Sequence, residues 1–423
     1  MLLAFCYDVK MKTDEYDVII IGSGGAGMIA AITSRKLGKK VLLLEKLPTL
    51  GAKLKATGGG KCNLTNTLSN EDFMDSFGRN GKFMIKAISM LDKNDLREFF
   101  SSIGVQTDTK DGFRIFPVTH NSSTIIKALE QELRRLEVEV LCDVKVDNIL
   151  VNDIQTTGVI TSKGEFLASN VIVATGGLGF PMLGANGDGH TFAKELGHKI
   201  TDLYPAMLPV YTKETWVANC TADTIAKAIV RIDLKKAKKL KAIGDLIFTS
   251  KGLRGPVILD FSREITPLLE KYEEVPLLIN MVKGKNEDEI FQHLKKQSSL
   301  NPDFNVLELL SSLLPLSVAK ALCLEVGANI DKKFKDQDGQ VRNDLVKIVA
   351  NTPFTVTDSV GFKKAMITRG GVSLKEIDPT TMQSKIINGL YFCGEVMDLD
   401  GPCGGYNLQW SFSSGNLAGH LYK

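Results

Sequence analysis

The sequence predicts an α/β protein whose open parallel sheet is built from two distant parts of the chain, with a small β-barrel and a helical subdomain inserted between them. Three observations support this fold class. A strand–glycine turn–helix–strand pattern begins near residue 16, two further buried strands end in glycine near residues 176 and 394, and strand-like and then helix-like segments separate those two strands. A length of 423 residues suits two or three domains.

The first element is a β-branched apolar run over residues 16–22 (YDVIIIG), which is typical of a buried parallel strand. The turn G-S-G-G-A-G over 22–27 follows, and then a helix is expected over 28–37 with Gly38 at its end. A second buried strand over 41–44 leads into Glu45. This is the G-x-G-x-x-G fingerprint of a dinucleotide site in its required context, with an acid about 20 residues further on.

Each residue type in the fingerprint has a physical role. Gly22 makes the tight turn, Gly24 lets a pyrophosphate approach the backbone, and Gly27 lets the helix pack closely on the strand. The helix N-terminus supplies N–H groups and a partial positive charge to phosphates. Glu45 would accept hydrogen bonds from a ribose. The fingerprint alone does not decide between NAD and FAD.

Three later segments bear on that choice. The loop over 53–66 contains consecutive glycines at 58–60, on whose backbone a flat ligand or a phosphate could lie. A buried strand over 170–177 ends in A-T-G-G. A last strand over 388–395 ends in Gly-Glu and precedes a glycine-rich turn, after which a helix rich in small residues is expected to begin near Asn407. Such a helix would abut a planar ligand at its N-terminus and pack tightly on a sheet.

At these motifs the chain resembles the bacterial NAD(P)/FAD-dependent oxidoreductase family that includes aminoacetone oxidase and the bile-acid enoyl reductases. The matching pieces include GAKLKATGGGKCNLTN at 51–66, TRGGVSLKEIDPTTMQSK at 368–385 and GLYFCGEVMDLDGPCGGYNLQWS at 389–411. The resemblance implies that FAD lies extended across the first domain, with the glycine run beside its pyrophosphate and isoalloxazine. N–H groups around 407–409 would then stabilise the negative charge of reduced flavin. The chain departs from many relatives at Ser250, where they have His, and the consequence is open.

The predicted cofactor residues lie in these glycine-rich segments and strand ends. They are Gly22, Ser23, Gly24, Gly25, Ala26, Gly27, Glu45, Lys46, Lys53, Thr57, Gly58, Gly59, Gly60, Lys61, Cys62, Asn63, Val146, Ala174, Thr175, Gly176, Gly177, Gly394, Glu395, Asp400, Gly404, Gly405, Tyr406, Asn407, Leu408 and Gln409. The catalytic residue is not identified, and the candidates are Lys61, Tyr406 and Asn407; Tyr406 is equally well explained as a packed aromatic. Five singly spread histidines and no paired cysteines predict no metal site.

The domain organisation follows from these assignments. We expect a discontinuous FAD-binding domain at 15–202 and 376–423, a β-barrel substrate domain at 203–285 and 351–375, a helical subdomain at 286–350, and a leader or disordered tail at 1–14. Either Met1 or Met11 could be the true start.

The expected function is an FAD-dependent oxidoreductase that transfers a hydride between a small organic substrate and flavin. The substrate would enter between the nucleotide domain and the barrel. No second G-x-G-x-x-G is visible, so either NADH or NADPH visits the flavin transiently as an electron donor or neither is used. We expect the transient donor. Three alternatives stay open: an oxygen-using amine oxidase of the aminoacetone type, a flavin-bound RNA-modifying protein, and a non-catalytic FAD-binding module.

The net charge and the cysteine content limit which partners and which compartment we expect. A net charge of +3 is small for this length, and the lysine run over 235–241 is expected to be a solvated edge, so no nucleic acid is expected. No apolar run reaches the roughly 18 residues of a membrane span. Seven dispersed cysteines without an export signal suggest reduced thiols and a cytoplasmic location. The oligomeric state is left open.

Overall fold

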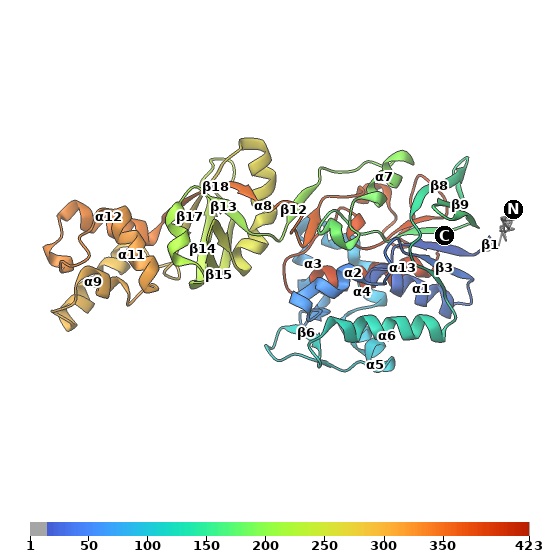
Figure 1. Ribbon diagram of the computed structural model, residues 1–423, viewed down its shortest axis with the longest axis horizontal. Coiled ribbons are helices and arrows are strands. Elements are labelled where there is room, and N and C mark those ends of the chain that lie inside the picture. Colours follow the sequence, from blue (N-terminus) through green and yellow to red (C-terminus); the bar gives the residue numbers. More distant parts are fainter. Residues whose placement is uncertain (1–14, 423) are drawn as a thin grey trace, which may run out of the picture. The chain divides into compact units, whose positions relative to one another are not determined.

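The computed structural model describes residues 15–422, so the predicted leader lies outside the described residues. By its internal contacts the chain divides into two compact units (Figure 1). The first unit runs to Leu203 and resumes at Ile367, and the second unit is Tyr204–Met366. Every helix within residues 15–422 is too short or too polar to cross a membrane.

The first unit is built on a five-stranded parallel sheet with the order β20-β11-β2-β3-β7. Its strands are β2 (Val18–Ile21), β3 (Val41–Leu44), β7 (Glu139–Leu141), β11 (Val171–Val173) and β20 (Leu390–Phe392). Side chains of β2, β3, β11 and β20 are buried without alternation, as expected for a sheet covered on both faces. Those four strands confirm the predicted sheet. The edge strand β7 was not predicted, because three residues, one exposed and two half-buried, give little periodic signal.

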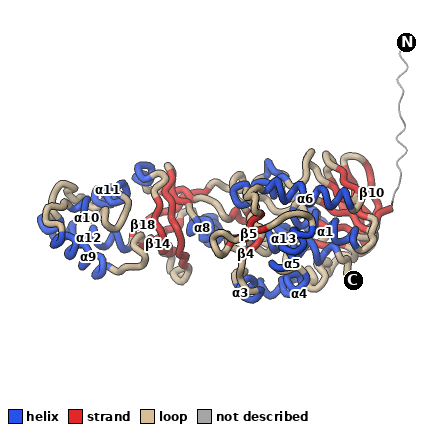
Figure 2. Tube along the Cα trace, turned by 90° about the horizontal axis from the view of Figure 1, so that it is seen from below, coloured by secondary structure: helices blue, strands red, loops and turns tan. Residues whose placement is uncertain are grey.

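Helices α1 (Gly25–Lys36) and α13 (Tyr406–Gly419) lie side by side in this unit (Figures 1 and 2). A Cβ added at Gly415 would lie 2.2 Å from the Ala26 carbonyl oxygen, and one at Gly419 would lie 2.6 Å from that of Ala30. The small residues of α13 were expected to pack on the sheet. They instead let the backbones of two helices approach closely.

The remaining elements of the first unit surround this core. Two further sheets have the orders β1-β10-β9-β8 (Glu15–Tyr16, Gly164–Ala168, Gln155–Thr161, Val146–Asn152) and β4-β6-β5 (Thr65–Asn66, Arg114–Pro117, Thr107–Asp108). The other helices are α2 (Ala52–Ala56), α3 (Asn70–Asp75), α4 (Ile85–Met90), α5 (Lys93–Ser102), α6 (Ser122–Arg135) and α7 (Asp188–Glu195), and β19 is Ile367–Arg369.

The second unit contains the predicted barrel, closed in the order β13-β16-β15-β14-β17-β18. Its strands are β13 (Val210–Thr212), β14 (Thr224–Ile232), β15 (Lys241–Thr249), β16 (Gly252–Arg254), β17 (Val275–Asn280) and β18 (Thr352–Ser359), and β12 is Tyr204–Ala206. One prediction here is wrong. The segment P-V-I-L after Gly255 lies within residues 203–285, which were expected to supply barrel strands, but it opens α8 (Pro256–Tyr272). Pro256 occupies the first turn of this helix, and Val257, Phe261 and Ile265 bury one face.

Helices α9 (Glu287–Leu300), α10 (Val306–Leu310), α11 (Leu316–Glu325) and α12 (Gly339–Ala350) complete the second unit. They share one apolar core with the barrel strands, in which Leu322 and Val346 join Val356. Barrel and helices therefore form one compact unit. Residues 367–375, expected in the barrel, belong to the first unit, where the Thr368 N–H donates to Glu395 (2.8 Å).

Candidate functional site

The turn between β2 and α1 contains glycines that the fold requires and one, Gly24, that faces open space. Gly22 has φ +100°, and a Cβ there would lie 2.7 Å from the Ala174 carbonyl oxygen. A Cβ at Gly27 would lie 1.9 Å from the Gly22 carbonyl oxygen. A Cβ at Gly24, the residue that caps α1, would meet no atom within 4 Å. The helix N-terminus is thus open at the carboxyl edge of a parallel sheet, where a pyrophosphate fits.

Glu45 follows β3 and lies against this turn. One carboxylate oxygen accepts from the Ser23 N–H (3.0 Å) and from the Ser23 hydroxyl (2.5 Å), and the other accepts from the Leu47 N–H (2.9 Å). Its position beside the glycine turn suits the predicted ribose contact. Lys46 is held elsewhere, since its ammonium pairs with Asp188 (2.6 Å) at the start of α7 and bonds to Asn186.

Glycines 58–60 owe their identity first to backbone conformation. Their φ values are +58°, +65° and +87°, which L side chains rarely adopt. A Cβ at Gly58 would also lie 2.9 Å from the Asn63 nitrogen, whereas Gly59 and Gly60 face open space. Cys62 shares the left-handed conformation with φ +60°. Its thiol is fully buried, and burial raises its pKa to about 12, so it is protonated and only its backbone could face a cofactor.

Lys53 and Glu395 bind one another. The Lys53 ammonium lies 2.7 Å from one Glu395 oxygen, and the other oxygen accepts from the Thr368 N–H. The Thr368 hydroxyl in turn accepts from the Leu178 N–H (2.7 Å). This network joins α2, the exits of β11 and β20, and β19. Sequence reasoning missed Thr368, and its only signal was the T-R-G-G motif before the last strand.

The N-terminus of α13 is the second polar edge of the site. Gly405 caps the helix with φ +87°, and helix geometry leaves the N–H groups of the first turn without acceptors in the helix. Gln409 does not share this role. Its N–H bonds to the Gly405 carbonyl (3.2 Å), and its side chain donates to Leu91 and Ser413, away from the turn.

The three catalytic candidates have different surroundings. The Asn407 side chain accepts from the Gly401 N–H (2.8 Å) and donates to the Gly401 carbonyl (2.9 Å), so it positions the turn before α13. Tyr406 is buried and stacks on Phe73 with ring centroids 5.1 Å apart, as the packed-aromatic alternative predicts. Lys61 is exposed on the glycine loop.

The other predicted residues would contribute mainly backbone groups to the site or hold it in place. The Val146 side chain is buried at the start of β8. Asn63 supports the site, because its amide can accept from the Gly405 N–H (3.0 Å) and donate to the Thr65 carbonyl (3.0 Å). The Thr175 hydroxyl, at the exit of β11, is buried and bonds to no group within residues 15–422. Such a polar atom, beside a glycine turn open at Gly24, fits a dinucleotide cofactor.

Comparisons with known proteins show the family to which the chain belongs. The family described as HI0933-like protein Rossmann domain matches residues 16–421. The 3-dehydro-bile acid delta(4,6)-reductase of Clostridium scindens is 30% identical over 95% of this chain and 97% of its own length. The ribosomal RNA dihydrouridine synthase of Haemophilus influenzae is 30% identical over 94% and 96%.

A solved structure shares the fold. The 3-ketosteroid delta1-dehydrogenase from Sterolibacterium denitrificans superposes with a TM-score of 0.53 at 13% identity, over 97% of this chain and 99% of that one. The resemblance seen in the motifs is thereby confirmed, and the family supports FAD as the cofactor. The chain belongs to the HI0933-like Rossmann-domain family and is an FAD-dependent oxidoreductase.

Proposed function

We propose that this chain reduces a carbon–carbon double bond conjugated to a carbonyl in a small organic substrate, with NADH or NADPH as the transient electron donor. The observation that carries the proposal is the glycine turn after β2. At Gly24 no protein atom would contact an added Cβ, and Glu45, at the end of the neighbouring strand β3, lies against the turn. The two relatives support the choice of reaction, because their names, a delta(4,6)-reductase and a dihydrouridine synthase, both describe the addition of hydrogen to a double bond.

The chain's own residues would prepare the site. When bound, FAD supplies a flavin that accepts and donates hydride. The first turn of α13 presents N–H groups and a partial positive charge toward an anion. Asn407 holds that turn through Gly401, and exposed Lys61 adds a positive charge on the glycine loop. The protonated thiol of Cys62 takes no part as a nucleophile.

Anaerobic stopped-flow absorbance of the yellow protein tests the proposal. Mixed separately with NADH, NADPH and aminoacetone, the flavin should bleach with a nicotinamide and recover its colour when an enone acceptor is added. Bleaching by the amine alone, with recovery in air, would instead establish an oxidase. An Asn407→Ala variant should keep FAD but slow both half-reactions, because the turn before α13 loses the two hydrogen bonds between the Asn407 side chain and the Gly401 backbone.

A second candidate substrate is uracil in RNA, whose C5=C6 bond is also conjugated to a carbonyl. The observation that favours it is the connection between β14 and β15. Leu234, Ala237 and Leu240 turn inward there, while four lysines are exposed and form no ion pair within residues 15–422: Lys235, Lys236, Lys238 and Lys239. A fixed cationic turn of this kind suits a phosphate backbone.

Binding of a structured ribosomal RNA fragment at several salt concentrations separates the two candidates. Replacing the four lysines by Gln should weaken RNA binding and flatten its salt dependence by about 0.7–0.9 for each phosphate that is no longer neutralised. Replacing Lys320, Lys332, Lys333 and Lys335 in the second unit is the charge-matched control. RNA binding that is equal in both variants, or reduction of enones without dihydrouridine formation, would leave only the small-molecule substrate.

A further inference from the structure

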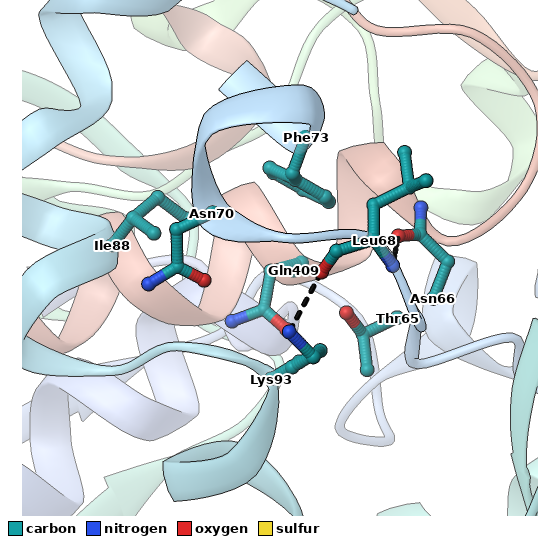
Figure 3. A pocket seen from close by; sticks show the side chains of 8 residues that line it. All are labelled: Thr65, Asn66, Leu68, Asn70, Phe73, Ile88, Lys93 and Gln409. Carbon is teal, nitrogen blue, oxygen red and sulfur yellow. Dashed lines mark hydrogen bonds between the residues drawn. The ribbon is translucent and has the colours of Figure 1, made fainter. Parts of the chain in front are cut away.

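A small cavity lies beside α13, one turn into the helix (Figure 3). The volume in which the centre of a water-sized sphere can lie is about 10 Å³. By this measure the space is about what one water molecule requires and too little for a larger ligand. The walls come from β4, from helices α3 to α5, and from α13, and they include Thr65, Lys93 and Gln409.

Two polar atoms in this wall are fully buried and bond to nothing within the part of the chain that the structure describes. They are the Thr65 hydroxyl oxygen and Gln409 Oε1, on residues whose exposed fractions are 0% and 1%. Burying a polar atom without a hydrogen bond is costly, and such atoms are rare in folded proteins. Two of them on one cavity indicate a shared ligand.

The orientation of the Gln409 amide is fixed by its neighbours. Its Nε2 donates to the Leu91 carbonyl (2.9 Å) and lies 2.9 Å from the Ser413 hydroxyl. The Leu91 carbonyl can only accept, so the amide nitrogen must face it. The Ser413 hydroxyl donates to the same carbonyl (2.6 Å) and can accept from Gln409. Oε1 is therefore left as an acceptor that requires a donor.

The polar groups in the cavity wall determine which kind of ligand can bind there. An anion would offer no proton to Oε1. A cation would be repelled by the Lys93 ammonium, which lines the same cavity and donates to the Leu68 carbonyl (2.7 Å; Figure 3). A neutral molecule that both donates and accepts, and that fits this volume, is water.

We propose that one ordered water molecule is a built-in part of this protein, bound between Thr65 and Gln409. It donates to Gln409 Oε1 and hydrogen-bonds with the Thr65 hydroxyl. It thereby links β4, at the end of the glycine loop, to α13 and through Gln409 to Leu91. The water holds together the two segments whose backbones border the cofactor site.

The sign of a stability change tests this. If the Thr65 hydroxyl were truly unpartnered, Thr65→Val would remove a buried polar atom and leave the holoenzyme as stable or more stable. If it binds the water, the same change breaks the link, and the urea midpoint should fall. Thr65→Val keeps the size of the side chain, so the wild type is its reference; Thr65→Ser removes the methyl group but keeps the hydroxyl, so it should still bind the water.

High-resolution crystal structures of the holoenzyme and of Thr65→Val complete the experiment. The wild-type map should show a single peak within hydrogen-bond distance of both atoms, and the Thr65→Val map should show it weakened or displaced. Absence of the peak in the wild type would overturn the proposal. A Thr65→Val urea midpoint that equals or exceeds that of the wild type would overturn it as well.

Discussion

At Gly24 an added Cβ would meet no protein atom within 4 Å, whereas at Gly27 it would lie 1.9 Å from the Gly22 carbonyl. Gly24 also has φ −67°, which any residue can adopt. The fold thus explains why Gly22 and Gly27 are glycines and does not explain Gly24. A ligand that approaches the backbone at Gly24 does explain it.

Gly24→Val should therefore separate cofactor binding from folding. We expect a protein that purifies colourless, because the valine occupies the place of the pyrophosphate, while its unfolding free energy falls by no more than about 1 kcal/mol below that of wild-type apoprotein, the cost of a poorer N-cap residue. Flavin absorbance and urea unfolding measure the two properties. Gly27→Val is the contrast and should lose stability even without cofactor. A yellow Gly24→Val with full flavin occupancy would refute the pyrophosphate placement.

Burial also acts on a single histidine near the site. The His190 ring contacts the Val396 carbonyl through Nε2 (3.2 Å), so Nε2 carries the proton of the neutral ring, and burial lowers the pKa of His190 below its ordinary 6.5. The unfolded chain regains the ordinary value and binds protons more readily. Well above pH 6.5 His190 is neutral in both the folded and the unfolded chain, so its titration does not affect stability. As the pH falls through 6.5, the unfolded chain binds the proton first, and the free energy of unfolding decreases.

Unfolding free energies measured between about pH 7.5 and 5 test this effect. We expect a slope of at most about 1.4 kcal/mol per pH unit from this histidine. His190→Gln keeps a donor for the Val396 carbonyl but cannot titrate, so its stability should fall less steeply. Equal slopes for variant and wild type would show that His190 is not responsible.

At the scale of elements, the close contact of α1 and α13 places the two helix N-termini that serve the site. Gly415 lies against the Ala26 carbonyl and Gly419 against that of Ala30, so glycine is needed on one helix where backbone is met on the other. The ion pair of Lys53 with Glu395 ties the two chain segments of this unit together a second time. The site therefore depends on contacts between residues that are far apart in the sequence.

Gly415→Ala should destabilise the protein by about 1–3 kcal/mol, because the new methyl group would overlap a backbone oxygen that cannot move aside cheaply. Equilibrium unfolding with and without FAD measures the change. Gly339→Ala is the matched control, since it adds the same methyl group to the first turn of α12, where only the Arg342 side chain comes within 4 Å. A Gly415→Ala protein as stable as this control would contradict the close helix contact.

At the scale of the whole molecule, each unit has its own apolar core. The core of the second unit is formed entirely by residues between Leu208 and Ala365, from the barrel strands and the helices that cover them. The core of the first unit joins residues before 203 to residues after 367. The chain thus leaves the first unit and returns to it around a unit that is continuous in sequence.

The continuous unit should fold by itself. Residues 204–366 expressed alone are expected to unfold in one cooperative transition in urea, followed by circular dichroism, because none of their core contacts is removed. The fragment should bind no FAD, since the glycine turns lie in the first unit. A fragment without a cooperative transition would show that its core depends on the first unit.

The sequence by itself determined four strands of the parallel sheet, its glycine turn, the barrel and the use of a dinucleotide cofactor, because buried strands and G-x-G-x-x-G are local patterns of spacing. It could not decide what side chains meet across the chain. Lys53 forms an ion pair with Glu395, and Tyr406 stacks on Phe73. Asn407 hydrogen-bonds to the Gly401 backbone. All three contacts depend on how the folded chain brings the residues together. The start of α8 was misjudged for a similar reason, since a short apolar run fits a buried strand or a helix until its packing face is known.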